Sequence, residues 1–176
     1  MATSTPTPPD DKSAPPPPER QQALDTLADQ TAAIDELIAL ARHSIRVFDY
    51  DLSETGWNGV ARTEALARFL RGNPNTRLDI IVHDTQWIER YGARLTSLVR
   101  RFAHAVTIQR TGSEARAAMD PLVIVDGRHF LHRHHVDHPM ATLGIDAPHA
   151  ANPLMRRFEE IWATGEPGVT ATTLGL

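Results

Sequence analysis

Five histidines lie between residues 129 and 138, and two of them, His132 and His134, are spaced so that they could act on one ligand. In an extended strand alternate side chains share a face, so these imidazoles should point one way, with Arg133 and His135 opposite. Imidazole nitrogen suits Zn²⁺, Ni²⁺ or Mn²⁺, especially beside carboxylates. The spacing permits a metal site. A polar strand end, whose histidines hydrogen-bond to carboxylates and backbone, explains the same residues.

Polar side chains also follow the other expected strands, at the point where each strand ends. They are Asp49 and Asp51, then His83 and Asp84, then Arg110 and Thr111. Because sites in α/β sheets form where strand ends converge, these residues and the histidines are candidates for one shared site. The metal candidates are His83, Asp84, His132 and His134. The candidates for holding a phosphate-containing ligand are Arg110, Arg133, His134, Asp49 and Asp51.

Hydrophobic periodicity predicts the elements that must position these residues. Helices are expected from about residue 31, with Asp29 as N-cap, and at 59–72, 85–105 and 151–168, the third with a break near Gly92. Strands are expected at 44–51, 77–85 and 105–112, and residues 22–28 fit either a strand or a helix start. Residues 121–135 read as a hairpin, because Asp126-Gly127 is a strong type I′ turn signal. The order predicts an α/β sandwich with a mixed sheet flanked by helices.

The inward faces of these helices are also expected from spacing. The residues are Ile34, Leu37, Ile38 and Ala41, then Val60, Leu66, Phe69 and Leu70, then Ile88, Tyr91, Leu95, Leu98 and Phe102, and last Leu154, Phe158, Ile161 and Trp162.

With its elements in this order, the chain resembles the phospholipase D-like superfamily over most of residues 30–163. The segments that carry the resemblance are "SIRVFDYDL", "RLDIIVHD", "VTIQ", the hairpin "PLVIVDGRHFL" and the closing "RFEEIWA", of which the last two are the most specific. Within the superfamily, the amino-acid sequence most resembles an uncharacterised bacterial branch with one domain per chain. The resemblance implies the fold of that superfamily.

Active members of the superfamily carry H-x-K, four residues, D, six residues and G-S-x-x-N. Their histidine attacks phosphorus, their lysine holds the phosphate oxygens, and each working site needs two motifs, from two domains or two subunits. If Asp126 is the motif aspartate, the histidine and lysine positions fall on Met119 and Pro121. The glycine, serine and asparagine positions fall on Arg133, His134 and Asp137. The aspartate is retained, but a type I′ turn also explains it.

Composition narrows the chemistry further. The chain has no cysteine, which excludes disulfides, thiolate metal sites and cysteine nucleophiles. Its only lysine is Lys12, in the N-terminal tail, so no lysine of the folded domain replaces the missing one. Beyond Arg20 the sequence holds 16 Arg against 19 Asp and Glu, a balance that argues against a nonspecific nucleic-acid binder.

Residues 1–19 contain 7 of the 13 prolines and almost no large apolar residue. Such a segment buries too little surface to offset its ordering entropy, so we expect a disordered tail and a single folded domain over residues 20–176. A solubilising role is expected of the tail, with recruitment of a protein partner as the alternative. Neither a secretory signal nor an apolar run long enough to span a bilayer is present, so a cytoplasmic location is expected.

These observations favour a non-catalytic phospholipase D-like domain that binds a phosphate-containing ligand or a protein partner, without a cofactor. The resemblance implies a homodimer, because active single-domain relatives pair subunits to complete a site. The alternative is a metal-assisted phosphoesterase or nuclease, in which a divalent ion activates water in place of the lost nucleophile. Two roles stay open for Arg133: to bind a phosphate, or to fill the old pocket by pairing with Asp49 or Asp51. For Trp57 they are a lid over the site and an anchor for its loop.

Overall fold

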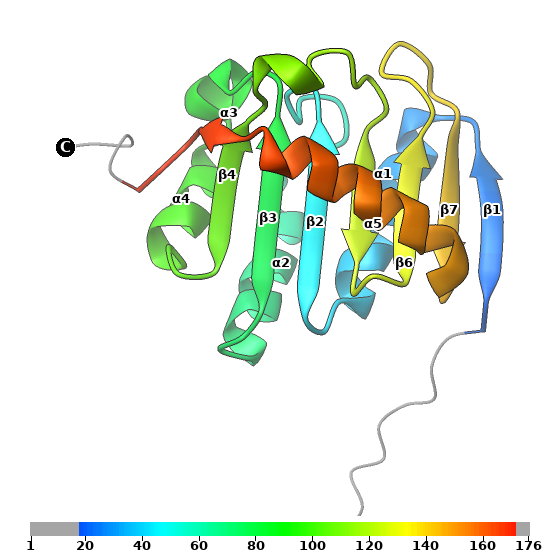
Figure 1. Ribbon diagram of the computed structural model, residues 1–176. Coiled ribbons are helices and arrows are strands. Elements are labelled where there is room, and N and C mark those ends of the chain that lie inside the picture. Colours follow the sequence, from blue (N-terminus) through cyan, green and yellow to red (C-terminus); the bar gives the residue numbers. More distant parts are fainter. Residues whose placement is uncertain (1–17, 172–176) are drawn as a thin grey trace, which may run out of the picture.

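A computed structural model of the chain describes residues 18–171 and contains one eight-stranded sheet (Figure 1). The strands lie in the order β1-β7-β6-β5-β2-β3-β4-β8. They are β1 (Arg20–Leu24), β2 (Ser44–Asp49), β3 (Arg77–Val82), β4 (Val106–Arg110), β5 (Leu122–Val125), β6 (His129–Arg133), β7 (Ala141–Ile145) and β8 (Glu166–Pro167). Of the proline-rich tail, residues 1–19, only residues 18 and 19 are described. The disorder and the partner recruitment expected of the tail therefore concern residues outside the described part.

The sheet is mixed, as the order of elements predicts. β2, β3 and β4 run parallel to one another, whereas β5, β6, β7 and β1 are each antiparallel to their neighbour. Since β5 is antiparallel to β2 and β6 reverses again, β6 points the same way as β2. The carboxyl end of β6 therefore lies at the same edge of the sheet as those of β2, β3 and β4.

Helices cover both faces of this sheet, in unequal number. They are α1 (Leu27–Leu40), α2 (Val60–Gly72), α3 (Gln86–Tyr91), α4 (Ala93–Arg101) and α5 (Pro148–Ala163), with a short 3₁₀ turn η1 (Ser113–Ala115). The first four helices share one core with Val47 of β2, while Phe48 faces the other core with Phe158 of α5. In Figure 1, α5 crosses the front of the sheet by itself. Burial on both faces explains the nearly continuous apolar runs of the central strands.

Two residues expected in the core are exposed instead. Val60 is 52% exposed because it is the first residue of α2, beyond the end of the sheet. Tyr91 is 64% exposed because it ends α3 at the break that the sequence predicts near Gly92. A Cβ on Gly92 would lie 2.6 Å from the Ile88 carbonyl oxygen, so only glycine fits this turn. Helical periodicity does not continue across such a break.

Two helices begin earlier than expected. The N-cap of α1 is Thr26, whose Oγ1 accepts a hydrogen bond from the amide of Asp29 at 3.0 Å, so Asp29 belongs to the first turn. Helix α5 begins at Pro148, before the expected start at residue 151, and Pro153 lies inside it. Proline at the first helical position lacks a donor that would be unpaired there in any case.

Strand β7 is not anticipated by the sequence, although it joins β6 to the edge strand β1. Its five residues lack a clear alternation, and Gly144 weakens the signal further. That glycine has a steric cause, since a Cβ there would lie 2.2 Å from a ring carbon of Phe130. None of the helices within residues 18–171 has the length and hydrophobicity to cross a membrane.

The hairpin between β5 and β6 is tied to the start of β2 by the carboxylate of Asp126. With φ of 52° for Asp126 and 65° for Gly127, the turn has the left-handed backbone that type I′ requires. The Asp126 carboxylate also accepts hydrogen bonds from the amides of Arg42, His43 and Ser44, each at 2.8 Å. The aspartate therefore serves both the turn and the loop that leads into β2.

We expect Asp126→Ala to lower the free energy of unfolding by about 3 kcal/mol, because three amides lose a charged acceptor and alanine disfavours positive φ. Asp126→Asn is the matched control, since asparagine tolerates this backbone and keeps one acceptor oxygen. Urea denaturation measures both variants. A loss below about 0.5 kcal/mol for alanine would show that the carboxylate does not hold this junction.

Candidate functional site

The strand ends that carry the polar candidates lie at one edge of the sheet, which is the upper edge in Figure 1. Within this edge, a pocket opens on the face covered by α1. Its polar lining residues are Gln30 of α1, Asp49 of β2, Thr55 of the loop after β2, and Arg133 of β6. The space left in it for the centre of a water molecule is about 20 Å³. That is about the room one ordered water molecule needs.

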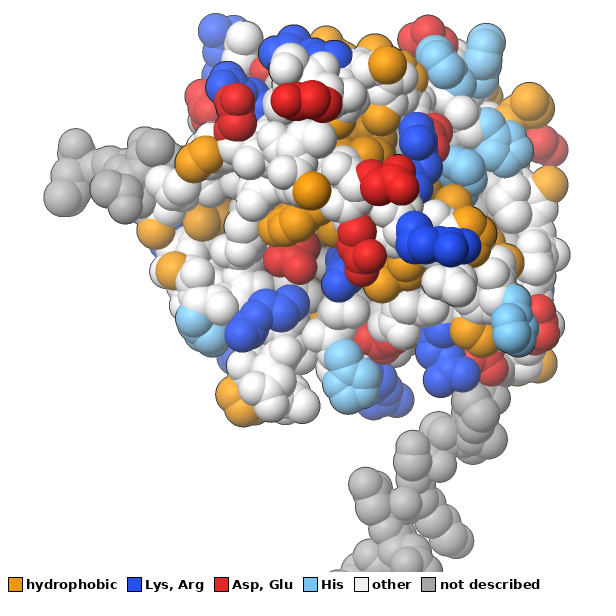
Figure 2. Space-filling model, in the orientation of Figure 1, with side chains coloured by type: hydrophobic (Ala, Val, Ile, Leu, Met, Phe, Trp, Pro, Cys, Tyr) orange, Lys and Arg blue, Asp and Glu red, His pale blue; other side chains and the backbone are white. Residues whose placement is uncertain are grey.

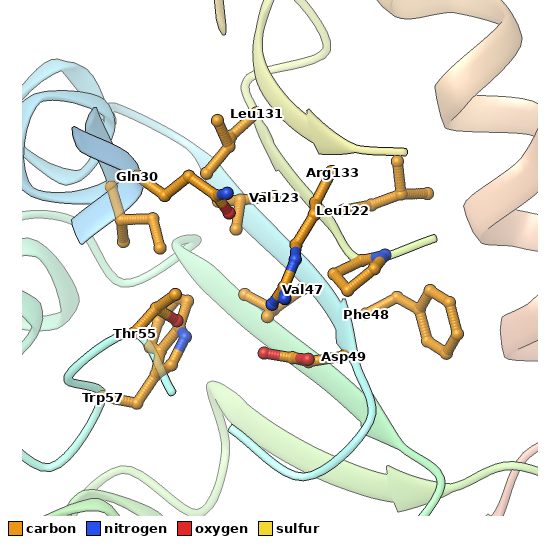
Figure 3. A pocket seen from close by; sticks show the side chains of 12 residues that line it. Gln30, Val47, Phe48, Asp49, Thr55, Trp57, Leu122, Val123, Leu131 and Arg133 are labelled. Atoms are coloured by element: carbon orange, nitrogen blue, oxygen red, sulfur yellow. The ribbon is translucent and has the colours of Figure 1, made fainter. Parts of the chain in front are cut away.

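The side chain of Arg133 extends into this pocket (Figure 3). It is only 5% exposed, and its guanidinium lies toward the carboxylate of Asp49 (Figure 3). Nη1 donates to Glu54 Oε2 at 2.5 Å, Nε donates to the His138 carbonyl at 2.7 Å, and Nη2 donates to the Val136 carbonyl. Each guanidinium nitrogen therefore already has an acceptor from the protein.

The carboxylate that pairs with Arg133 is Glu54, rather than Asp49 or Asp51 as anticipated for a filled pocket. Glu54 comes from the loop that joins β2 to α2, where Leu52 and Gly56 have φ of 69° and 77°. These two left-handed residues turn the loop back over the sheet edge, which brings Glu54 to the guanidinium. The loop is anchored by Trp57, which is fully buried, so that residue is an anchor and not a lid.

Asp49 lies at the floor of the pocket in an environment that opposes its ionisation. Burial raises the pKa of Asp49 to about 7, and the neighbouring carboxylates Asp51 and Glu54 add to the rise. A hydrogen bond from the Tyr50 amide, 2.7 Å from Asp49 Oδ1, and the charge of Arg133 oppose it. Two carboxylates thus compete for one buried cation, and Glu54 holds the hydrogen bond.

His83 is fixed inside the protein and does not face the pocket. Its Nδ1 lies 2.6 Å from Thr111 Oγ1 and its Nε2 lies 2.6 Å from the Ala118 carbonyl oxygen. A carbonyl only accepts, so Nε2 carries the proton and both ring nitrogens are used. The adjacent Asp84 accepts from the amide of Gln86 at 2.8 Å, which makes it part of the turn into α3.

Two further candidates of the sheet edge also make local bonds. Asp51 accepts from the amide of Ser53 at 2.9 Å, inside the loop that carries Glu54. Arg110, expected to bind phosphate, is exposed and pairs with Glu166 of β8 at 2.9 Å. It lies on the far side of β3 and β2 from Arg133, so the structure does not bring these two arginines into one site.

His132 of β6 and His134, which follows this strand, lie on the opposite face of the sheet, the face that α5 covers. His132 Nε2 is 3.1 Å from Asp120 Oδ2, and Arg157 of α5 binds the same carboxylate, with 2.6 Å between its Nε and Oδ2. Burial alone would raise the pKa of Asp120, but hydrogen bonds from His132 and Arg157 outweigh it and lower the pKa to about 2. His134 is exposed, and its Nε2 is 3.1 Å from Thr142 Oγ1.

The four metal candidates are therefore not brought together. His83 is locked between β3 and the segment before β5, while His132 and His134 lie on the α5 face near Asp120. Among residues 18–171, no group of three or more His, Cys, Asp or Glu side chains is arranged to hold a metal ion. The expected cluster does not form, because His83 points inward and both of its ring nitrogens are hydrogen-bonded inside the protein.

Three groups that shape this edge were missed by sequence reasoning: Glu54, Gln30 and the Asp120–Arg157 pair. Gln30 is fully buried in α1, and its Nε2 donates to the Pro139 carbonyl at 2.5 Å. A glutamine on the apolar face of an expected helix was the only available signal. Glu54 and Arg157 sit in polar stretches, where nothing distinguishes them from solvated residues.

Comparison with known proteins assigns the chain to a family. The model of a domain of unknown function, DUF7931, matches residues 26–173. The chain belongs to this family. No curated protein matches the sequence.

Several solved structures share the fold at low identity. An archaeal chromatin protein, TrmBL2, whose structure is described as showing a novel mode of DNA binding, matches with a TM-score of 0.61 and 13% identity. That match covers 84% of this chain and 54% of the other, so the chain spans about half the length of the chromatin protein. NucT from Helicobacter pylori matches with a TM-score of 0.56 and 12% identity, over 85% of this chain and 99% of NucT.

A phospholipase D family member, Nuc from Salmonella typhimurium, matches with a TM-score of 0.55 and 11% identity, over 85% of this chain and 97% of Nuc. At such identity the likeness shows the fold alone. The expected phospholipase D-like fold is confirmed by it.

The raised pKa of Asp49 makes stability depend on pH in a defined direction. The folded state keeps a proton on Asp49 that the unfolded chain releases at its ordinary value of 3.8, so the stability tied to this residue is lost as pH rises from about 4 to about 7. Asp49→Asn removes this titration. Between these pH values, the stability of wild type should fall relative to that of the variant by about 2 kcal/mol. This is less than the full pKa shift would give, because the carboxylate is partly open to solvent.

Urea denaturation of wild type and Asp49→Asn at several pH values tests this expectation. Parallel stability curves for the two proteins would mean that Asp49 ionises normally in the folded state.

Proposed function

We propose that this protein is a non-catalytic phospholipase D-like domain that acts by binding a second copy of itself through the sheet edge that holds the strand ends. The observation that carries the proposal is the pocket that Arg133 occupies. Glu54 and two carbonyls occupy the guanidinium of Arg133, and the remaining space admits about one water molecule. A phosphodiester does not fit there without displacing these groups.

The residues at the motif positions support the loss of chemistry. Met119 and Pro121 take the places that the resemblance assigns to the nucleophilic histidine and the phosphate-binding lysine. Pro121 lines the pocket beside Arg133, where it offers neither charge nor a hydrogen-bond donor. Methionine is no nucleophile toward phosphorus, and the described part of the chain contains no lysine.

Exposed apolar side chains at the same edge support a protein partner. The large apolar residues exposed within residues 18–171 are Tyr50, Val60, Tyr91 and Met140. Tyr50 follows β2, Val60 begins α2, Tyr91 ends α3 and Met140 precedes β7, so each lies where the parallel strands end. Asn58 joins two of these segments, because its Nδ2 donates to the Tyr91 carbonyl at 2.8 Å. They are spread along this edge, from the loop between β6 and β7 to the end of α3, and a partner that covers the edge would bury them.

A second copy is the partner that the resemblance favours, since active single-domain relatives pair subunits at their sites. A dimer built on this edge would keep the assembly after its catalytic groups are gone. In a two-fold symmetric dimer each copy contributes the same surface, so no partner with a different surface is required.

The filled-pocket part of the proposal is tested with Arg133→Ala. We expect the variant to lose about 2 kcal/mol of stability, because Glu54 and two carbonyls lose their donor, and to bind inorganic phosphate no differently from wild type. Arg110→Ala, which removes an exposed arginine outside the pocket, is the control. Phosphate that stabilises wild type but not Arg133→Ala would contradict the filled pocket.

The assembly is tested by sedimentation velocity of the untagged full chain. We expect a dimer. Its dissociation constant should rise by at least about tenfold in Tyr91→Glu and in Met140→Glu, since a charge buried at an apolar contact is costly. Ala39→Glu places the same charge on an exposed position at the far end of α1 and should leave the dimer intact. A monomeric wild type at about 100 μM, or equal effects of all three variants, would overturn the proposed interface.

A further inference from the structure

Outside the pocket, His132 and His134 form a pair of imidazoles on the α5 face of the sheet. Their ring centroids are 5.6 Å apart and their planes are inclined by 72°. Figure 2 shows histidine side chains gathered at the upper right of this face. The pairing arises because the two residues alternate at the end of β6, so the intervening Arg133 points to the other face.

The first histidine presents a defined nitrogen. Asp120 pairs with the guanidinium of Arg157 as a carboxylate, and a carboxylate only accepts hydrogen bonds, so the bond to His132 requires the proton on Nε2. In neutral His132 the lone pair is therefore on Nδ1. Arg157 holds Asp120 in place from α5, with a hydrogen bond to each carboxylate oxygen. A histidine whose other nitrogen is fixed by a carboxylate is the arrangement that supports metal ligands in proteins.

The second histidine has the same nitrogen engaged. Its Nε2 lies 3.1 Å from the hydroxyl of Thr142, a residue of β7 that stands directly opposite His132 in the strand register. Among the described residues, the Nδ1 of neither His132 nor His134 has a hydrogen-bond partner. Both rings thus keep one nitrogen available, on one face of one strand end.

We propose that His132 and His134 bind one late first-row divalent ion, Zn²⁺, Ni²⁺ or Cu²⁺, through their Nδ1 atoms, with Asp120 and Thr142 as supporting partners. These ions favour imidazole, and a metal–nitrogen length of 2.0–2.1 Å places two rings on one tetrahedral ion with centroids roughly 5 Å apart. The observed 5.6 Å is close to that value.

Water would complete the coordination, because no third His, Cys, Asp or Glu among residues 18–171 is placed to join. A site of two protein ligands binds more weakly than a closed structural zinc site. This site lies on the other face of β6 from the pocket that Arg133 occupies. It adjoins the proposed dimer edge, since the amide of His134 donates to the carbonyl of Met140 at 3.0 Å.

Calorimetric titration of the untagged full chain with ZnCl₂ and NiCl₂ tests the site. We expect one equivalent bound per chain, and loss of that binding in both His132→Ala and His134→Ala. Thr142→Val should weaken affinity by about tenfold through loss of the supporting hydroxyl. Melting of each variant without metal checks that it is folded.

Two controls distinguish this pair from other histidines. His149→Ala removes an exposed histidine from the first turn of α5, at the opposite edge of the sheet, and should bind like wild type. The double variant His135→Ala/His138→Ala removes the neighbouring pair, whose centroids are 5.9 Å apart, and should also retain binding. No binding by wild type, or loss only in the double variant, would overturn the assignment.

Discussion

A buried guanidinium must have counter-charge and acceptors, and this requirement organises the polar edge of the protein. Arg133 enters the sheet edge from β6 with almost no contact with solvent, so each of its nitrogens has to be matched by the protein. Glu54 supplies the charge, and the backbone after β6 supplies the carbonyls of Val136 and His138. The loop after β2 and the loop after β6 are thereby joined through one side chain.

That constraint divides the edge into two chemical environments separated by the sheet. On the α1 face, an arginine, Asp49 and a buried glutamine line a small pocket, and Glu54 pairs with the arginine. On the α5 face, Asp120 and Arg157 hold His132 next to His134. A single residue step along β6 moves from one environment to the other, because successive side chains point to opposite faces. The polar strand ends therefore do not form one site, even though they share an edge.

Local patterns in the sequence predict much of this fold. The parallel strands, the hairpin turn and the sharing of a face by His132 and His134 follow from spacing over a few residues. What the sequence does not reveal depends on pairs far apart in the chain. Arg133 and Glu54 are 79 residues apart, and Asp120 and Arg157 are 37 apart. No local periodicity tells which of many surface carboxylates will meet a buried arginine, and β7 is defined by its partners more than by its own composition.

The role of Asp126 bears on how sequences of this kind are interpreted. Its carboxylate gathers three backbone amides at the entrance to β2 while its own backbone forms the turn. Both tasks belong to folding, and neither involves a substrate. Selection for a stable fold would by itself be enough to retain an aspartate at this position. Its presence alone is therefore no marker of activity.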